Sequence, residues 1–361
     1  MIEACFACTT PYQIIGAISI TLGKKIDADL FVFGMFPNYQ VVCENIRKQN
    51  IFHDVYDIDC SDIGWPSRGK AFFQMVFAPK VVSSFLPPDI SYRTYYSSSR
   101  AHPKTLLQYV LLKRNPSMER VIYEDGLGTY AGNSHPLNAT KLRKISETIL
   151  GWKLDVPEKT TMMASIPELV DIPEYLQERE VVQMPRLNFD ATTSNMLKSI
   201  FSVDDSRIIT SRIIIFDTLR PNPAYLNEDD FRIIDECYRI IGQAVEYKDV
   251  IVKPHPRSKY NGDHDIALYE YQEVPMEVLY AGMKDLDQLV LITYTSSAVF
   301  TPKIMFDKEP VVISLHRMLS NTKSSIIFDP IYEKFKNIYS DKEKVAAPET
   351  LNELELLVGA I

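Results

Sequence analysis

The stretch DVIVKPHPRS runs from apolar residues into a histidine flanked by prolines and basic residues. His255 lies between Pro254 and Pro256, so its backbone has little freedom and its side chain is suited to point in one direction. A protonated histidine there could hydrogen-bond a phosphate leaving group or donate a proton to it. With Lys253 and Arg257 nearby, the segment predicts an anion site in a chain whose formal net charge is -8. A surface loop with incidental basic residues explains the same pattern.

A pair of adjacent acidic residues forms the second candidate. In VIYEDGLGTY, Glu124 and Asp125 follow an apolar run and precede Gly126. Adjacent carboxyl groups at a strand end can carry acid–base chemistry, and glycine lets a substrate approach the backbone closely. Asp-Gly is also a common turn pair, so by itself the segment favours a simple turn.

A group of hydroxyl side chains forms the third candidate. In LITYTSSAVF, Thr295, Ser296 and Ser297 lie between an apolar run and a helix-like segment. Hydroxyls and free backbone N–H groups at a helix N-terminus can bind phosphate. Serine is also a good N-cap, which explains the pattern equally well. Asp217, which ends RIIIFD, is a further carboxylate at a strand end and a rival for the acid–base role.

Strand-like and helix-like segments alternate along the chain and would position these residues. Thr10 and Pro11 have the types of an N-cap and a first helical residue for PYQIIGAISITLG, after the strand-like IEACFACTT. Further strand-like segments in the first half are DLFVFG, HDVYDID, RTYYSSS and RVIYEDG. From Gly151 to Asp190 the pattern weakens, and irregular structure is expected. A second series then contains RIIIFD, DVIVKPHP, QLVLITYTSS and EPVVISL, separated by helix-like segments.

Short apolar strands that alternate with helices indicate parallel sheets covered on both faces. Two such series in 361 residues predict an α/β fold of two Rossmann-like domains, 1–190 and 191–361, facing a central cleft. The His255 and Ser296 loops would leave the same edge of the second sheet, and the Asp125 loop would face them from the first domain.

The composition narrows the class of protein. The apolar fraction of 46% and the charged fraction of 24% are ordinary for a soluble globular enzyme. No apolar run reaches the roughly 18 residues of a membrane-spanning helix, and the N-terminal segment does not have the pattern of a signal peptide. The acidic balance argues against a nucleic-acid partner, because nucleic-acid binders normally present a basic face. A cytoplasmic protein is predicted.

No metal or other cofactor is predicted. Cys5 and Cys8 form a C-x-x-C, but no second pair and no paired histidines complete a zinc site, so buried thiols in a reducing compartment are expected. D-x-D patterns, which can bind divalent ions, are expected by chance in a chain with 47 acidic residues. They occur at Asp27/Asp29, Asp57/Asp59 and Asp285/Asp287.

In their order along the chain, these segments resemble the motifs of the bacterial sialyltransferases, particularly glycosyltransferase family 52. The resemblance rests on a D/E-D/E-G motif, an HP motif and a late hydroxyl motif, here Glu124-Asp125-Gly126, His255-Pro256 and Ser296-Ser297. VPMEVL is similar to the segment whose glutamate, here Glu277, contacts the nucleotide ribose. CTTPYQIIGA is similar to the family's opening strand, turn and helix.

The resemblance implies a GT-B fold whose first domain binds the acceptor and whose second binds the cytidine monophosphate of CMP-sialic acid. Asp125 would be the general base that removes the acceptor hydroxyl proton, and His255 would stabilise or protonate the departing phosphate. The donor-binding residues would be Lys253, Pro256, Glu277, Thr295, Ser296, Ser297, Gly126, Thr10 and Asp217. Gln13 could also touch the sialyl group. Direct displacement would invert the anomeric configuration.

The implied activity is metal-independent transfer of sialic acid to a galactose-terminated glycan of a bacterial capsule or lipooligosaccharide, usually with an α2,3 linkage. The alternatives are a family 52 glucosyltransferase, another nucleotide-sugar transferase, or a nucleotide-sugar-binding protein without turnover. The sequence does not decide whether the chain forms a homodimer. It also does not decide whether the basic segment LRKISETILGWKL makes peripheral contact with the inner face of the cell membrane. In GT-B folds a closing helix, here ETLNELELLVGAI, often returns to the first domain.

Overall fold

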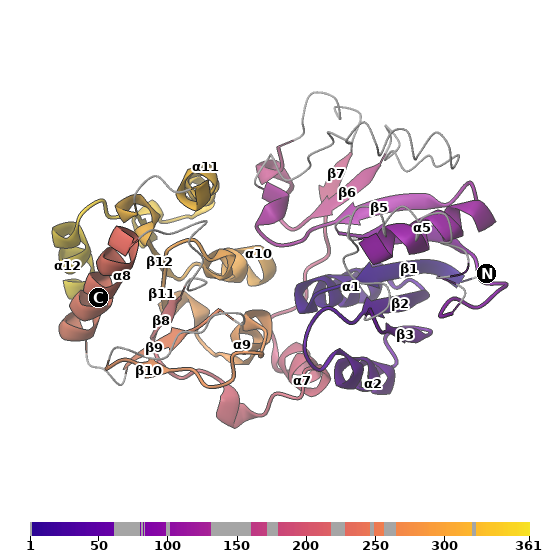
Figure 1. Cartoon of the computed structure of the whole chain (residues 1–361), viewed down its shortest axis with the longest axis horizontal. Helices are drawn as coiled ribbons and strands as arrows, with labels where there is room; N and C mark the ends of the chain where they lie inside the picture. Colours follow the sequence, from indigo (N-terminus) through magenta and orange to yellow (C-terminus); the bar gives the residue numbers. More distant parts are fainter. Residues whose placement is uncertain are drawn as a thin grey trace. The chain divides into compact units, whose positions relative to one another are not determined.

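The computed structural model describes residues 2–60, 80, 82, 84–98, 102–130, 160–171, 180–217, 228–245, 249–255, 265–319 and 323–361. The chain divides into two compact units. The first unit comprises Met1–Leu187 and Ser199–Ser202, and the second comprises Asn188–Lys198 and Val203–Ile361. Each unit contains its own sheet (Figure 1).

The first unit is built on a seven-stranded sheet of order β3-β2-β1-β4-β5-β6-β7, and all its neighbouring strands are parallel. Its strands are β1 (Ile2–Cys8), β2 (Ala28–Phe33), β3 (Val55–Ile58), β4 (Tyr92–Ser97), β5 (Glu119–Tyr123), β6 (Thr161–Ala164) and β7 (Val181–Gln183). The described helices of this unit are α1 (Pro11–Lys24), α2 (Tyr39–Gln49) and α5 (His102–Arg114). Helix α7 (Ala191–Ile200) follows at the junction, and its residues up to Lys198 belong to the second unit.

The second unit is built on a six-stranded sheet of order β10-β9-β8-β11-β12-β13, again with parallel neighbours. Its strands are β8 (Ile213–Phe216), β9 (Val250–Lys253), β10 (Ala267–Leu268), β11 (Val290–Thr293), β12 (Val311–Ser314) and β13 (Val345–Ala346). Its helices are α8 (Glu228–Ala244), α9 (Met276–Gly282), α10 (Thr301–Phe306), α11 (Lys323–Ile338) and α12 (Leu351–Gly359). Two parallel sheets with helices confirm the predicted α/β fold with two Rossmann-like domains.

Strand order reverses once in each sheet. In the first sheet β1, β2 and β3 follow one another outward on one side, while β4 starts the other side next to β1. In the second sheet the same reversal lies between β8 and β11. The loops that follow the two strands at such a reversal run in opposite directions. A crevice forms between them at the carboxyl edge of the sheet, where ligands of open α/β sheets bind. In each unit, a ligand site is therefore expected at the carboxyl edge where the strand order reverses.

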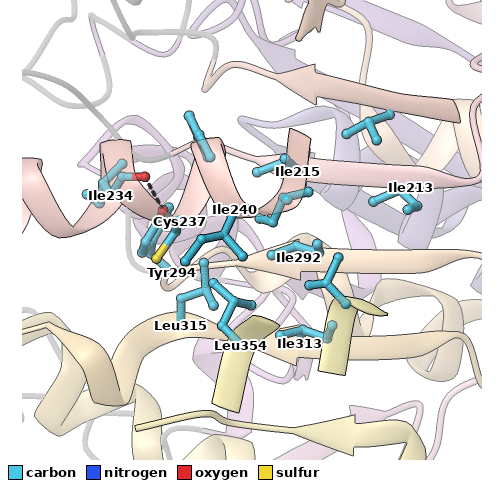
Figure 2. Packing of buried hydrophobic residues seen from close by; sticks show 14 of the residues in the cluster. Ile213, Ile215, Ile234, Cys237, Ile240, Ile292, Tyr294, Ile313, Leu315 and Leu354 are labelled. Carbon is cyan, nitrogen blue, oxygen red and sulfur yellow. Dashed lines mark hydrogen bonds between the residues drawn. The ribbon is translucent and has the colours of Figure 1, made fainter. Parts of the chain in front are cut away.

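Burial on both faces explains why the strands are continuously apolar. In the second unit, Ile213 and Ile215 of β8 point into a core that also contains Ile292 and Ile313 of the neighbouring strands (Figure 2). Ile214, the residue between them, is also fully buried. Strands that are covered on one face only would alternate apolar and polar residues, and these do not.

The closing helix belongs to the second unit, so the expectation that it returns to the first domain is wrong. Helix α12 contacts α8, and Leu354 lies in the same core as the central strands (Figure 2). Val358 belongs to that core too. Leu351 packs against this core as well. Spacings of three and four residues put these side chains on one face of α12, and that face is buried against α8.

The prediction for the end of the first unit was also wrong. Irregular structure was expected from Gly151 to Asp190, but β6 and β7 lie there and pair in parallel with β5 and with each other. These strands have only four and three residues, so their apolar pattern is too short to recognise. The basic segment LRKISETILGWKL lies outside the described residues. Within the described part of the chain, no helix is long and apolar enough to cross a membrane.

Leu354→Ala should lower the free energy of unfolding by about 3 kcal/mol, because the side chain is fully buried and its removal leaves a cavity. Leu356→Ala on the same helix should change it by less than about 0.5 kcal/mol, since Leu356 is 75% exposed. Urea unfolding followed by circular dichroism measures both. Equal effects would contradict the packing of α12 described here.

Candidate functional site

Gln13 is the centre of a hydrogen-bond network at the carboxyl edge of the first sheet. Thr10 caps α1 by accepting from the Gln13 backbone N–H at 3.3 Å, which holds Gln13 in the first turn. The side-chain Oε1 of Gln13 accepts from Thr9 N at 2.8 Å, Thr9 Oγ1 at 3.0 Å and Lys104 Nζ at 3.2 Å. Its Nε2 donates to Asp125 Oδ1 at 2.9 Å. Because donors surround Oε1, the amide N–H must face Asp125.

The adjacent carboxyl groups after β5 have different environments. Glu124 is fully buried and accepts hydrogen bonds from the hydroxyls of Tyr12 and Tyr130 and, at 2.7 Å, from the Ser165 backbone N–H. Burial raises the pKa of Glu124, and these hydrogen bonds oppose the rise. Asp125 is only half-buried. Glu124 therefore holds the loop to the rest of the unit, while Asp125 presents a carboxylate to the outside.

The loop conformation after Asp125 requires glycine. Gly126 has a φ of 63°, in the left-handed region that other residues rarely adopt. A Cβ there would meet only the Tyr12 ring, at 3.8 Å, which is ordinary contact. The backbone angle, and not crowding, explains Gly126. The Asp125 N–H then donates to Thr129 Oγ1 at 2.9 Å, which closes the turn.

Lys104 is a site residue that the sequence reading missed. Its side chain is 1% exposed, and its Nζ donates to Gln13 Oε1 and, at 3.5 Å, to Ser98 Oγ. Burial lowers the pKa of Lys104 to about 8, against the charge of Asp125, which raises it. One sequence signal was present. A lysine in the first turn of a helix opposes the helix dipole, so its position at the start of α5 calls for another partner.

At the carboxyl edge of the second sheet, strand register brings together several predicted residues. Phe216 at the end of β8 pairs with Lys253 of β9 on one side and with Thr293 of β11 on the other. The loops after these three neighbouring strands therefore begin side by side, at the same edge of the sheet. The predicted residues in these loops are Asp217 after β8, His255 after β9, and Thr295, Ser296 and Ser297 after β11.

Lys253 is a buried cation at this edge. It is 5% exposed, its Nζ donates to the Gln272 carbonyl at 3.0 Å, and it lies 5.0 Å from the centre of the Tyr269 ring. Burial lowers its pKa to about 8, against the charges of Glu277 and Glu273. Glu277 lies in the first turn of α9, where burial raises its pKa and the charge of Lys253 opposes the rise.

The hydroxyl residues after β11 form a turn. Thr293 Oγ1 accepts from the Ser296 N–H at 2.7 Å, and Ser296 Oγ accepts from the Ala298 N–H at 3.3 Å. Ser296 therefore caps the short 3₁₀ turn Ser297–Phe300 that leads into α10. Ser297 is exposed and Thr295 half-buried.

Asp217 and His255 differ in exposure. Asp217 is 3% exposed, and its Oδ1 accepts from the Tyr238 hydroxyl of α8 at 2.6 Å. His255 is half-buried at the end of the described part of its loop, and Pro256 and Arg257 lie outside the described residues. The burial of Asp217 and its hydrogen bond to Tyr238 are typical of a carboxylate that positions a loop.

Among the described residues, no group of three or more His, Cys, Asp or Glu side chains could hold a metal ion. Members of the D-x-D patterns make structural contacts instead. Asp29 is buried against the Tyr92 hydroxyl at 2.6 Å, Asp57 pairs with Arg47, and Asp287 accepts from the Glu309 N–H at 2.6 Å.

No protein-family model and no curated protein sequence matches the chain. Three solved structures are similar in outline. LpCGTa in complex with UDP has 10% identity and a TM-score of 0.47 over 100% of this chain and 90% of that one. UDP-N-acetylglucosamine 2-epimerase from Rickettsia bellii has 11% identity and 0.41 over 100% and 95%. A UDP-glucosyltransferase from Polygonum tinctorium has 9% identity and 0.43 over 99% and 93%. At these scores the similarities assign neither a family nor an activity.

Glu124→Ala should lower the free energy of unfolding by about 3 kcal/mol, because it leaves the buried Ser165 N–H and Tyr130 hydroxyl without their acceptor. Glu124→Gln should cost less than about 1.5 kcal/mol at pH 7, since the amide keeps one acceptor oxygen and the shape of the side chain. Chemical unfolding at pH 7 compares the two variants.

The pH dependence of the same variants tests the raised pKa of Glu124. A carboxyl whose folded pKa exceeds its unfolded value of about 4.3 contributes most stability below that pH, and loses it as the pH rises through the folded pKa. The difference in unfolding free energy between Glu124→Gln and the wild type should therefore move in favour of the variant from pH 4 to pH 7. A difference that is constant across this range would contradict the environment described for Glu124.

Proposed function

We propose that the chain is an inverting sialyltransferase that moves sialic acid from CMP-sialic acid to a galactose-terminated glycan of a bacterial surface polysaccharide. The observation that carries the proposal is the geometry of Asp125. Its Oδ1 accepts from Gln13, and within the described part of the chain its Oδ2 accepts no hydrogen bond. A half-exposed carboxylate that is oriented through one oxygen and open at the other is suited to act as a general base.

The proposed reaction forms and breaks one bond to the sugar. The acceptor hydroxyl oxygen attacks the anomeric carbon of sialic acid, and its proton passes to Asp125. The bond from the anomeric carbon to the phosphate oxygen breaks, and the electron pair leaves with CMP. Attack opposite the leaving group inverts the anomeric configuration. A carboxylate is the right partner for the proton, because positive charge develops on the sugar and its attacking oxygen.

The donor, CMP-sialic acid, is proposed to bind at the carboxyl edge of the second sheet. Lys253 supplies positive charge in a desolvated position, where electrostatic attraction to a phosphate is stronger than in water. His255 lies two residues after Lys253, in the loop that follows β9, and is assigned to the leaving phosphate. Thr295 and Ser297 offer hydroxyls after β11, and Glu277 offers a carboxylate for a ribose hydroxyl. The reversal of strand order between β8 and β11 is the reason to expect a nucleotide here.

The proposal includes metal-independent turnover in a reducing cytoplasm. The five cysteines are free and buried, an arrangement suited to such a compartment. Thr10, Gly126 and Asp217 act in this scheme through the backbone and loops that they hold.

Purified protein should form sialyllactose from CMP-sialic acid and lactose in the presence of EDTA. Asp125→Asn should lower kcat at least about 100-fold, the usual contribution of a general base, and leave the thermal shift caused by CMP unchanged. Asp89→Asn, an exposed aspartate of the same unit, is the control and should keep full activity. Full activity of Asp125→Asn would remove Asp125 from the mechanism.

CMP should raise the melting temperature more than UDP does at equal concentration. Lys253→Met should weaken CMP binding about tenfold, because it removes a buried positive charge close to the strand ends, while Lys284→Met, an exposed lysine of the same unit, should not. Isothermal titration of each variant with CMP measures this. Stabilisation by UDP and not CMP would favour a glucosyltransferase, and stabilisation by neither would overturn the donor assignment.

A further inference from the structure

We propose that Lys104 and Gln13 are positioning residues that act through Asp125: Lys104 locks the orientation of the Gln13 amide, and Gln13 holds the Asp125 carboxylate ready to accept a proton. The role of Asp125 as the base rests on the proposed function. The network itself does not, because it consists of hydrogen bonds between side chains of the first unit.

Lys104 acts from inside the protein. Its side chain is 1% exposed, so a substrate in the solvent-facing part of the site cannot reach it. Its ammonium donates to Gln13 Oε1 at 3.2 Å and to Ser98 Oγ at 3.5 Å. An ammonium group is costly to bury, and a fold retains one where its charge or its hydrogen bonds have a use. Any effect of Lys104 on the reaction must therefore pass through its neighbours.

Gln13 is the neighbour that transmits the effect. A glutamine amide can rotate by half a turn and exchange its oxygen with its nitrogen, which would turn an acceptor toward Asp125. Here the rotated form would place the amide N–H groups against the donors of Thr9 and Lys104. That arrangement leaves the buried Thr9 N–H without its acceptor and sets an amide N–H group against the Lys104 ammonium. The amide donor is consequently kept on the Asp125 side.

The charge of Lys104 adds to this effect. Its ammonium polarises the Gln13 amide, and hydrogen bonds in such a chain strengthen one another. It also attracts the Asp125 carboxylate directly, since the charge of Asp125 opposes the lowering of the Lys104 pKa. Among the described residues, the ionisable groups whose charges act on Lys104 include Asp125, from the loop after β5, and the Cys8 thiol, at the end of β1. Burial raises the pKa of Cys8 to about 12, so the Cys8 thiol carries no charge near neutral pH.

A purely structural lysine would behave differently. Such a residue would stabilise the start of α5, and its loss would lower the melting temperature without changing the titration of Asp125. The positioning role predicts a change in the carboxylate itself. The decisive readout is therefore the protonation of Asp125 in the folded protein without substrate, which does not depend on any assumed reaction.

The experiment follows the Asp125 carboxyl carbon by NMR in protein labelled with ¹³C at the aspartate side chains, with the signal identified by its absence in Asp125→Asn. Lys104→Met should raise the midpoint of the Asp125 titration by about one pH unit, the effect of removing one nearby opposite charge. Gln13→Glu should raise it at least as much, because a carboxylate replaces the donor. Lys113→Met, on the exposed part of the same helix, should leave it unchanged. Lys104→Gln, which keeps a donor without the charge, replaces Lys104→Met if that variant does not fold.

Turnover with CMP-sialic acid and lactose provides the second readout. Both neutral variants of Lys104 should lower kcat at least about tenfold with the KM for the donor unchanged, and the acid limb of the pH profile should move upward with the NMR midpoint. An Asp125 midpoint that is the same in wild type, Lys104→Met and Lys104→Gln would overturn the inference. Full activity of Asp125→Asn together with the shifted midpoints would instead overturn the assignment of the base and leave the network intact.

Discussion

Parallel pairing of every neighbouring strand is the constraint on which the rest of this protein depends. It sends all the carboxyl ends of a sheet to one edge, so residues that are far apart in the chain meet there without any further device. Gln13 and Asp125 are 112 positions apart, yet they follow strands of one sheet and share a hydrogen bond. Lys253 and Thr293 both pair with Phe216 at the end of β8. Helices on both faces supply the burial that makes such a sheet stable.

Burial then gives neighbouring groups different chemistry. Glu124 and Asp125 are adjacent carboxyl groups, and their strand places one inside and the other at the surface. The inner one is surrounded by donors and joins β5 to α1 through Tyr12 and to the segment after β6 through Ser165. The outer one is half-buried and accepts a hydrogen bond from Gln13. An inner residue held by several hydrogen bonds fixes the position of the carboxylate next to it.

Among the residues that the structure describes, each unit buries one lysine at the carboxyl edge of its sheet. Lys104 and Lys253 both have a pKa lowered to about 8 by burial. Both are therefore charged at neutral pH, but their charge is screened less by water than that of a surface lysine. Lys253 lies at the strand ends that precede the hydroxyl residues, and Lys104 lies beside Gln13, where the charge of Asp125 acts on it.

The sequence determined the local elements. Runs such as IIIF and VLIT, the Thr10-Pro11 cap and the amphipathic pattern of α8 specify strands, a helix start and a buried face through neighbours in the chain, and the two-domain α/β fold follows from their alternation. It also placed Asp125, His255 and Ser296 after strands. Tertiary structure alone decided that α12 packs on α8, that the short β6 and β7 extend the first sheet, and that Glu124 faces inward. It alone brought Lys104 to Gln13, 91 positions away. Burial, pairing partners and charge environment are sums over contacts between distant segments, and local residue patterns do not specify which segments make those contacts.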